Sequence, residues 1–251
     1  MYYIDINCDV GESFGAYTLP EQDMLFDYIS SANIACGFHA GDPDVMQRTV
    51  ARAVEKRVAI GAHPGFNDVQ GFGRREIHMS PKEIYNMVLY QIGALYGFVK
   101  TAGGKLHHVK PHGALYNMAA RDENLATAIV QAVYDFDKRL YLYGLAGSKL
   151  ILSAHKIGLP VASEVFADRN YQDDGKLTPR SQDDAIIADT TQAVKRALDM
   201  ITQQQVLSTN QRSIAIKADT LCIHGDHEKA LLLAKTIYNQ LIQQGVKIKA
   251  P

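Results

Sequence analysis

The stretch YIDINCDVGE, residues 3–12, decides between the two architectures that the rest of the chain allows. Residues 3–8 predict a β-strand, and the polar turn Asp9-Val10-Gly11-Glu12 follows it at once. A doubly wound nucleotide-binding sheet would carry a glycine-rich phosphate loop after its first strand. The turn matches neither of the two common phosphate-loop motifs, and no other segment supplies one. The stretch therefore favours a closed β/α barrel.

Six more strand-like runs follow, mostly continuous in apolar character, as expected for strands buried on both faces of a parallel sheet. They lie at residues 33–36, 58–62, 106–109, 140–145, 161–166 and 221–223. Helical patterns fill the gaps, with start signals at Asp42, Ser80 and Asp226 and a stop at Gly245. Further helical patterns cover residues 122–136, 148–156 and 183–203. Since no linker or repeat interrupts this alternation, we expect one α/β domain over residues 1–251, a seven-stranded β/α barrel.

Composition argues against several classes of protein. Apolar residues make up 47% of the chain and charged residues 21%, with a net charge of −1 and both signs interleaved. We therefore expect neither nucleic acid nor a membrane as a partner. The chain shows no signal peptide and no apolar membrane span, and its three cysteines (Cys8, Cys36, Cys222) lack CxxC spacing. We expect a cytoplasmic protein whose cysteines are buried free thiols.

Ionisable side chains gather at the predicted carboxyl ends of six of the seven strands. In a parallel barrel these ends meet at one mouth, where active sites are built. The residues are Asp9, Glu12, His39, His63, Lys110, His112, Glu164, Asp168, Arg169 and His224. Imidazoles and carboxylates in one pocket suit proton transfer near neutral pH, or binding of a divalent metal that activates water. We expect His39, His63, His112 and His224 to share one cavity.

A metal is the narrower of these two interpretations. Metal-dependent deacetylases of related barrels use one aspartate and two histidines, and Asp9, His39 and His63 can imitate that set. Because the chain has neither an HxH nor an HxxxH pair, the ligands would have to come from separate strands. His108, which shares a strand face with Lys110, is expected to pack inside the barrel.

Two loops carry arginines. Residues 70–75 form a Gly-Arg loop, either a solvated loop or a clamp for a carboxylate or phosphate. Arg169 and Arg180 flank the polar loop 170–178, which has the composition of an active-site lid.

Seven segments together resemble the LamB/YcsF family, whose members are the A subunits of the prokaryotic ATP-hydrolysing 5-oxoprolinases. They span nearly the whole chain in the family's order, and the second is the most specific. The segments are NCDVGE (7–12), SANIACGFHAGDP (31–43), GAHPGF (61–66), GFGRR (71–75), VKPHGALYN (109–117), SEVFADRNY (163–171) and HGD (224–226).

The resemblance implies an irregular seven-stranded β/α barrel similar to those of glycoside hydrolases and polysaccharide deacetylases. It also implies ATP-dependent opening of 5-oxoproline to glutamate, in a complex with companion subunits B and C. A five-membered lactam is a stabilised amide, so its opening needs the driving force of ATP. Since this chain has no phosphate loop, we expect the companions to bind much of the nucleotide or to activate the lactam.

Ring opening needs a water nucleophile, a base, a proton donor for the departing nitrogen, and cations for the carboxylate. Candidates for catalysis are Asp9, Glu12, His39, His63, His112, Glu164 and His224. Candidates for substrate or anion binding are Asn33, Arg74, Lys110, Asp168, Arg169 and Arg180.

Two other functions stay open at this point. The chain could be a stand-alone metal-dependent deacetylase or amidohydrolase of a sugar or lactam, which would turn over without ATP. It could also be a non-catalytic subunit that binds substrate or acts as a scaffold. A homo-oligomer is compatible with each of the three.

Overall fold

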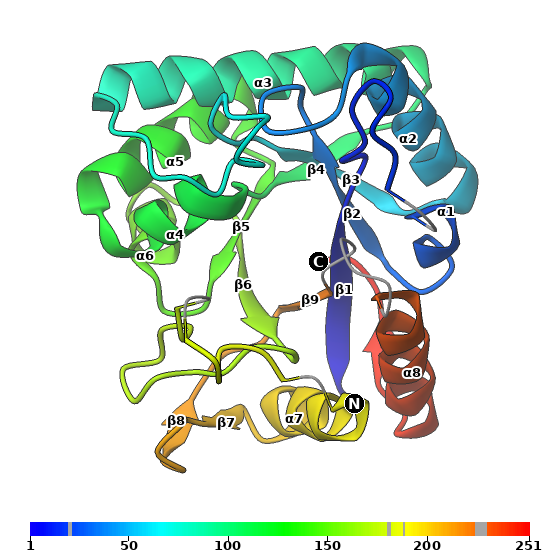
Figure 1. Ribbon diagram of the computed structural model, residues 1–251, viewed down its shortest axis with the longest axis vertical. Helices are drawn as coiled ribbons and strands as arrows, with labels where there is room; N and C mark the ends of the chain where they lie inside the picture. The colour runs from blue at the N-terminus through cyan, green and yellow to red at the C-terminus, as the bar shows by residue number, and fades with distance from the viewer. Residues whose placement is uncertain (20–21, 180–181, 188, 224–229) are drawn as a thin grey trace.

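The barrel closes through its first and last strands. The computed structural model describes residues 1–19, 22–179, 182–187, 189–223 and 230–251. Within these residues, seven parallel strands form a closed ring in which the last pairs with the first (Figure 1). In ring order they are β1 (Tyr3–Val10), β2 (Ser31–Ala35), β3 (Ala59–His63), β4 (Leu106–Val109), β5 (Tyr141–Leu145), β6 (Val161–Phe166) and β9 (Thr220–Ile223). Each overlaps a run predicted from the sequence, and the seven-stranded β/α barrel is confirmed.

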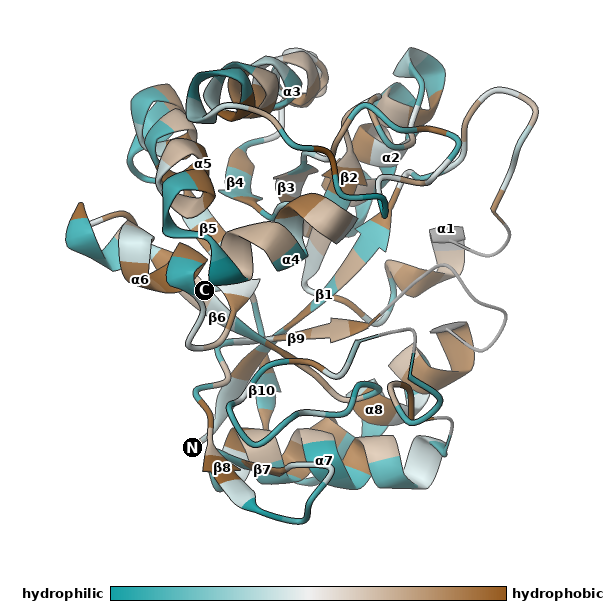
Figure 2. Cartoon of the chain, turned by 60° about the vertical axis from the view of Figure 1, so that its left-hand side comes forward, coloured by the Kyte–Doolittle hydropathy of each residue, from teal (hydrophilic) through white to brown (hydrophobic). Residues whose placement is uncertain are grey.

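Helices lie around this ring. They are α1 (Gln22–Leu25), α2 (Pro43–Lys56), α3 (Pro81–Thr101), α4 (Gly113–Arg121), α5 (Glu123–Asp137), α6 (Lys149–Lys156), α7 (Thr190–Thr202) and α8 (Ala230–Gln243). Most of them pack against strands of the ring, whereas α1 and α7 pack against α8. Figure 2 shows hydrophilic and hydrophobic residues alternating along α3, α5 and α7, as in amphipathic helices. In the part of the chain that the structure describes, no helix combines the length and apolar composition of a bilayer span.

The predicted helix starts at Asp42 and Ser80 are confirmed. The side chain of Asp42 accepts a hydrogen bond from Val45 N at 2.8 Å, and Pro43 occupies the first position of α2. Ser80 and Glu83 form a reciprocal capping box at the start of α3. Gly245 follows α8 with a positive φ of 74°, as expected for a helix stop. The start expected at Asp226 lies outside the described residues.

One predicted helix is too long. The helical pattern over residues 183–203 predicts a start near Asp183, but α7 begins at Thr190, with Asp189 accepting from Gln192 N at 3.0 Å. The preceding residues are held by tertiary contacts, since Asn170 N donates to Ala185 O at 3.1 Å. These backbone bonds compete with helix formation.

Several short elements escape prediction. The helix α4 begins after His112, whose side chain makes no capping bond. The antiparallel hairpin of β7 (Gln205–Leu207) and β8 (Ser213–Ala215) is short and mostly exposed. The two-residue strand β10 (Lys247–Ile248) extends the sheet beside the start of β1.

The inside of the barrel is polar. Barrels of this type are ordinarily filled by branched apolar side chains. Here Asn7 donates to Glu164 Oε1 at 2.9 Å and to Thr220 Oγ1 at 2.7 Å. Its own Oδ1 accepts from Asn33 Nδ2 at 2.7 Å and from Lys110 Nζ at 3.1 Å. The apolar core lies instead between the strands and the helices, and a hydrogen-bonded network fills the interior.

We expect Asn7→Leu to lower the free energy of unfolding by about 3 kcal/mol or more, because each buried partner that it leaves unsatisfied costs about 1–3 kcal/mol. Urea denaturation measures this loss. The exposed Asn124→Leu variant is the control and should stay within about 0.5 kcal/mol of the wild type. A loss below about 1 kcal/mol for Asn7→Leu would mean that the interior satisfies these groups in another way.

Candidate active site at the barrel mouth

Three histidines from three strand ends pack together at the carboxyl-terminal mouth of the barrel. His39 lies in the loop after β2, His63 ends β3, and His112 follows β4. The rings of His39 and His112 are stacked at 3.7 Å between centroids, and His63 meets them edge-on at 5.4 Å and 4.8 Å. The expected proximity is confirmed for these three. His224 lies outside the described residues.

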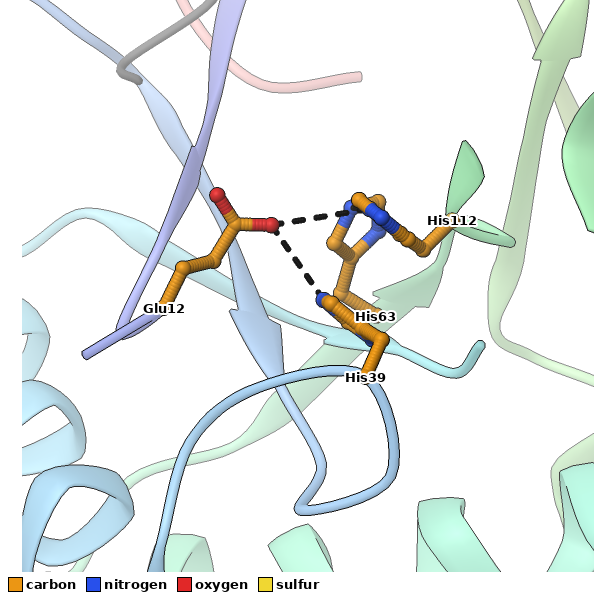
Figure 3. A group of neighbouring side chains, drawn as sticks. All are labelled: Glu12, His39, His63 and His112. Carbon is orange, nitrogen blue, oxygen red and sulfur yellow. Dashed lines mark hydrogen bonds and ion pairs between the residues drawn. The ribbon is translucent and has the colours of Figure 1, made fainter. Parts of the chain in front are cut away.

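Glu12, just beyond the end of β1, approaches the same histidines (Figure 3). Its Oε1 lies 3.2 Å from His39 Nε2 and 3.5 Å from His112 Nδ1. All four side chains are buried. One carboxylate and three imidazoles from separate segments therefore converge on one point.

Backbone carbonyls fix the orientation of two of the rings. His63 Nδ1 lies 2.7 Å from Lys110 O, and His112 Nε2 lies 2.8 Å from Phe72 O. Because a carbonyl oxygen only accepts, these two nitrogens carry hydrogen. Phe72 adopts a left-handed backbone conformation (φ 53°), which is strained for a non-glycine residue. The nitrogens that remain, His63 Nε2 and His112 Nδ1, are 2.9 Å apart.

Burial keeps the rings of His39 and His112 uncharged. It lowers the pKa of His39 and of His112 well below the ordinary value, and His63 adds to the effect on both. Both rings are therefore neutral at pH 7, and each can offer a lone pair.

Glycine is required where the loops cross these rings. A Cβ atom on Gly65 would lie 2.7 Å from His39 Nδ1, and one on Gly73 would lie 2.8 Å from His112 Cδ2. Gly73 also has a positive φ of 62°. A side chain at either position would force the rings apart.

A second charged cluster lies deeper, around the buried ammonium of Lys110. Its Nζ is 2.9 Å from Asp9 Oδ1, 2.8 Å from Glu164 Oε1 and 3.1 Å from Cys222 Sγ. Burial alone would lower the pKa of Lys110, but the attraction of Asp9 and Glu164 outweighs it and the pKa lies well above its ordinary value. The three N–H donors of the ammonium are taken by protein acceptors, so we expect Lys110 to orient carboxylates rather than to bind a substrate anion.

Asp9 connects the two clusters. Its Oδ1 accepts from Lys110 and, at 2.8 Å, from Asn33 Nδ2, while its Oδ2 lies 3.4 Å from His63 Nε2. Its side chain is 14% exposed, more than the side chains of His63, Lys110 and Glu164. Asp9 is therefore the carboxylate of this cluster that a ligand at the mouth reaches most readily.

Sequence reasoning missed Tyr116, on α4. Its hydroxyl is buried near Glu164, and burial together with that carboxylate raises the pKa of the phenol well above its ordinary value. Neither the hydroxyl nor Glu164 Oε2 has a hydrogen-bond partner among the described residues. The segment VKPHGALYN contains this tyrosine, but on a buried helix face it resembles a core residue.

Arg74 lies in a different setting from Arg169 and Asp168. Arg74 is exposed, stands over the Phe72 ring at 5.0 Å, and contributes to lowering the pKa of His39. Arg169 is buried and donates to Thr178 O at 2.7 Å and to Ala185 O at 3.3 Å, which braces loop 170–178. Asp168 is buried beside it. Arg180 lies outside the described residues.

The cysteines and His108 behave as expected. All three cysteines are free and buried, and burial raises the pKa of Cys36 to about 12. His108 packs inside the barrel, stacked on Tyr143 at 4.1 Å, and donates from Nε2 to Asn33 Oδ1 at 2.7 Å. A Cβ on Gly61 would overlap this ring, at 2.0 Å from its Nε2.

Comparison with known proteins gives consistent relatives. The model of the LamB/YcsF family matches residues 4–251. A protein of Geobacillus kaustophilus, named as the A subunit of 5-oxoprolinase, is 58% identical over 251 residues, which cover 100% of this chain and 98% of that protein. The crystal structure of the lactam utilization protein from Thermus thermophilus superposes with a TM-score of 0.95 at 46% identity, covering 99% of this chain and 100% of the other.

A more distant likeness concerns the fold alone. The catalytic domain of a peptidoglycan N-acetylglucosamine deacetylase from Eubacterium rectale superposes with a TM-score of 0.53 at 12% identity. The alignment covers 100% of this chain and 88% of that one. The barrel thus belongs to the same broad architecture as the deacetylase barrels.

His108 predicts a pH dependence of stability. Burial lowers its pKa well below the ordinary value, and the nearby His107 and Lys110 add to this. In the unfolded chain the imidazole binds a proton near pH 6.5, whereas in the folded chain it stays neutral. The stabilisation is therefore complete above about pH 6.5 and is lost as the pH falls, by about 1.4 kcal/mol per pH unit.

Urea denaturation between pH 7.5 and 5.5 measures the slope of the free energy of unfolding against pH. His108→Gln should reduce this slope by an amount that corresponds to about one proton. Groups that titrate in both proteins, including Asp5, cancel in the difference. His155→Gln, on the exposed side of α6, should keep the wild-type slope. Equal slopes for His108→Gln and the wild type would show that His108 titrates alike in both states.

Proposed function

Because this chain belongs to the LamB/YcsF family, we propose that it is the A subunit of a 5-oxoprolinase that cleaves 5-oxoproline to glutamate with consumption of ATP. The observation that carries the proposal is the full-length identity to proteins that are named as A subunits of 5-oxoprolinase. Companion subunits B and C complete the enzyme, and the name of these relatives supports a complex. Since the sequence lacks a phosphate loop, the companions bind the nucleotide or deliver the activated lactam.

The mouth supplies the groups that ring opening needs. Lys110 and Asn33 hold Asp9 Oδ1, so Oδ2 is the oxygen that approaches His63. In this proposal Asp9 takes the proton of the attacking water, and Arg74 at the exposed rim binds the substrate carboxylate. The high pKa of Tyr116 keeps its hydroxyl protonated and able to donate a hydrogen bond.

We expect the isolated chain to form negligible glutamate from 5-oxoproline, with or without ATP, and to become active when both companions are added. The reason is that the lactam needs activation that this barrel has no phosphate loop to provide. Glutamate release is the measurement, and the complex without 5-oxoproline is the blank. Robust turnover by the chain alone without ATP would instead support the stand-alone amidohydrolase, and robust ATP-dependent turnover by the chain alone would show that this barrel uses the nucleotide itself.

In the reconstituted complex, Asp9→Asn should lower 5-oxoproline-dependent ATP turnover by about 10²–10⁴-fold, the usual contribution of a proton-transfer group. The substitution conserves shape and removes the base. Asp135→Asn, exposed on α5, is the matched control and should retain wild-type activity. Turnover by Asp9→Asn within about threefold of the wild type would favour a scaffold role for this chain.

A further inference from the structure

The cluster of Glu12, His39, His63 and His112 has the geometry of a ligand set. Each residue offers one nitrogen or oxygen atom, and the four atoms all lie within 4.8 Å of one another. The residues come from four separate segments, and all four side chains are buried (Figure 3). Four buried polar atoms that converge from four segments must either hydrogen-bond to one another or bind a shared ligand.

Mutual hydrogen bonds do not satisfy the His63–His112 pair. His63 Nδ1 and His112 Nε2 already donate to the carbonyl oxygens of Lys110 and Phe72. In two neutral rings, His63 Nε2 and His112 Nδ1 are then both acceptors, and they face each other at 2.9 Å. Two lone pairs at this distance repel, so a positive charge must lie at this point.

That charge is either a proton shared by the two rings or a metal ion. A shared proton accounts for the His63–His112 contact alone. It leaves the contact of His39 Nε2 with Glu12 Oε1, at 3.2 Å, as a separate hydrogen bond, although Glu12 Oε1 also lies 3.5 Å from His112 Nδ1. A metal ion uses all four atoms.

The spacing fits a small divalent ion. Ligand atoms about 2.0–2.1 Å from a tetrahedral zinc ion lie roughly 3.3 Å from one another. Three of the six separations in this cluster, 2.9, 3.2 and 3.5 Å, bracket that value, and all six are within 4.8 Å. Metal-binding histidines commonly donate their second ring N–H to a backbone carbonyl, which is the arrangement of His63 and His112.

We propose that Glu12, His39, His63 and His112 bind one divalent first-row transition-metal ion at the barrel mouth. Three imidazoles and one carboxylate favour such an ion over Mg²⁺ or Ca²⁺, which prefer oxygen ligands. The set differs from the one that the sequence favours, since Glu12 and His112 take the place of Asp9. Asp9 Oδ1 accepts hydrogen bonds from Lys110 and Asn33, so Asp9 lies beside the ion and is not one of its ligands.

The metal adds a cofactor to the site of the proposed reaction, but its binding depends on neither substrate nor companions. A divalent ion there would polarise a carbonyl or lower the pKa of a bound water. Asp9 Oδ2, 3.4 Å from His63 Nε2, lies close enough to accept a proton from a ligand at this position.

The test uses the full chain alone. Chelator-treated protein is incubated with Zn²⁺, separated from free ion by gel filtration, and analysed for metal content. The wild type should retain about one Zn²⁺ per chain. His112→Ala and the near-isosteric Glu12→Gln should weaken Zn²⁺ binding at least tenfold, since even outer-shell substitutions cost 10–100-fold. Co²⁺ supplies a second readout, a visible absorption spectrum that reports coordination and that both variants should lose.

His155→Ala, which removes an exposed histidine of α6, is the control for surface binding and should bind Zn²⁺ like the wild type. Circular dichroism establishes that each variant is folded. If folded Glu12→Gln and His112→Ala both bind Zn²⁺ as tightly as the wild type, the ion lies elsewhere and the proposal is wrong. If the wild type binds none, a shared proton bridges His63 and His112, and the proposal is equally wrong.

These results do not decide the proposed function, because cleavage of 5-oxoproline is measured separately, on the complex.

Discussion

The ammonium of Lys110, buried between Asp9 and Glu164, is the contact on which the barrel mouth depends. Its side chain fixes one oxygen of each carboxylate, and its backbone carbonyl fixes His63. The side chain and the backbone carbonyl belong to the same residue, at the end of β4. Lys110 therefore holds the charged cluster and the histidine cluster at a fixed distance and orientation from each other. A buried ion pair adds little net stability, so its value here lies in the positions that it imposes.

The strands could be predicted because the signals are local. Continuous apolar runs mark them, and polar residues mark their carboxyl ends, which a parallel barrel brings to one mouth. The two capped helix starts were predictable for the same reason. The start of α7 was not, since backbone bonds from Asp168 and Asn170 hold the preceding residues. The helix α4 has no side-chain cap at its start, and each strand of the β7–β8 hairpin is only three residues long, too short for a clear alternating pattern.

In the candidate site, too, the features with a local sequence signal could be predicted and those set by tertiary contacts could not. Residue type and strand-end position bring Asp9, Glu12, His39, His63, Lys110, His112 and Glu164 together. Which carbonyl each imidazole meets could not be predicted, because Phe72 O reaches His112 from a distant loop with a left-handed backbone. Likewise, Lys110 resembles an anion-binding residue in the sequence, and only the folded chain shows that its donors are occupied. Tyr116 stayed hidden because a buried aromatic residue on a helix is ordinarily part of the core.

The polar interior has a consequence for how such a barrel can diverge. In an apolar core, residues can be exchanged singly for others of similar volume at modest cost. Here Asn7 alone contacts side chains from β2, β6 and β9, as well as Lys110, so its replacement requires simultaneous changes in several strands. The effects of substitutions within the network are therefore non-additive. During evolution these residues should change together as a set. A laboratory library that varies one interior position at a time will therefore contain mostly destabilised variants.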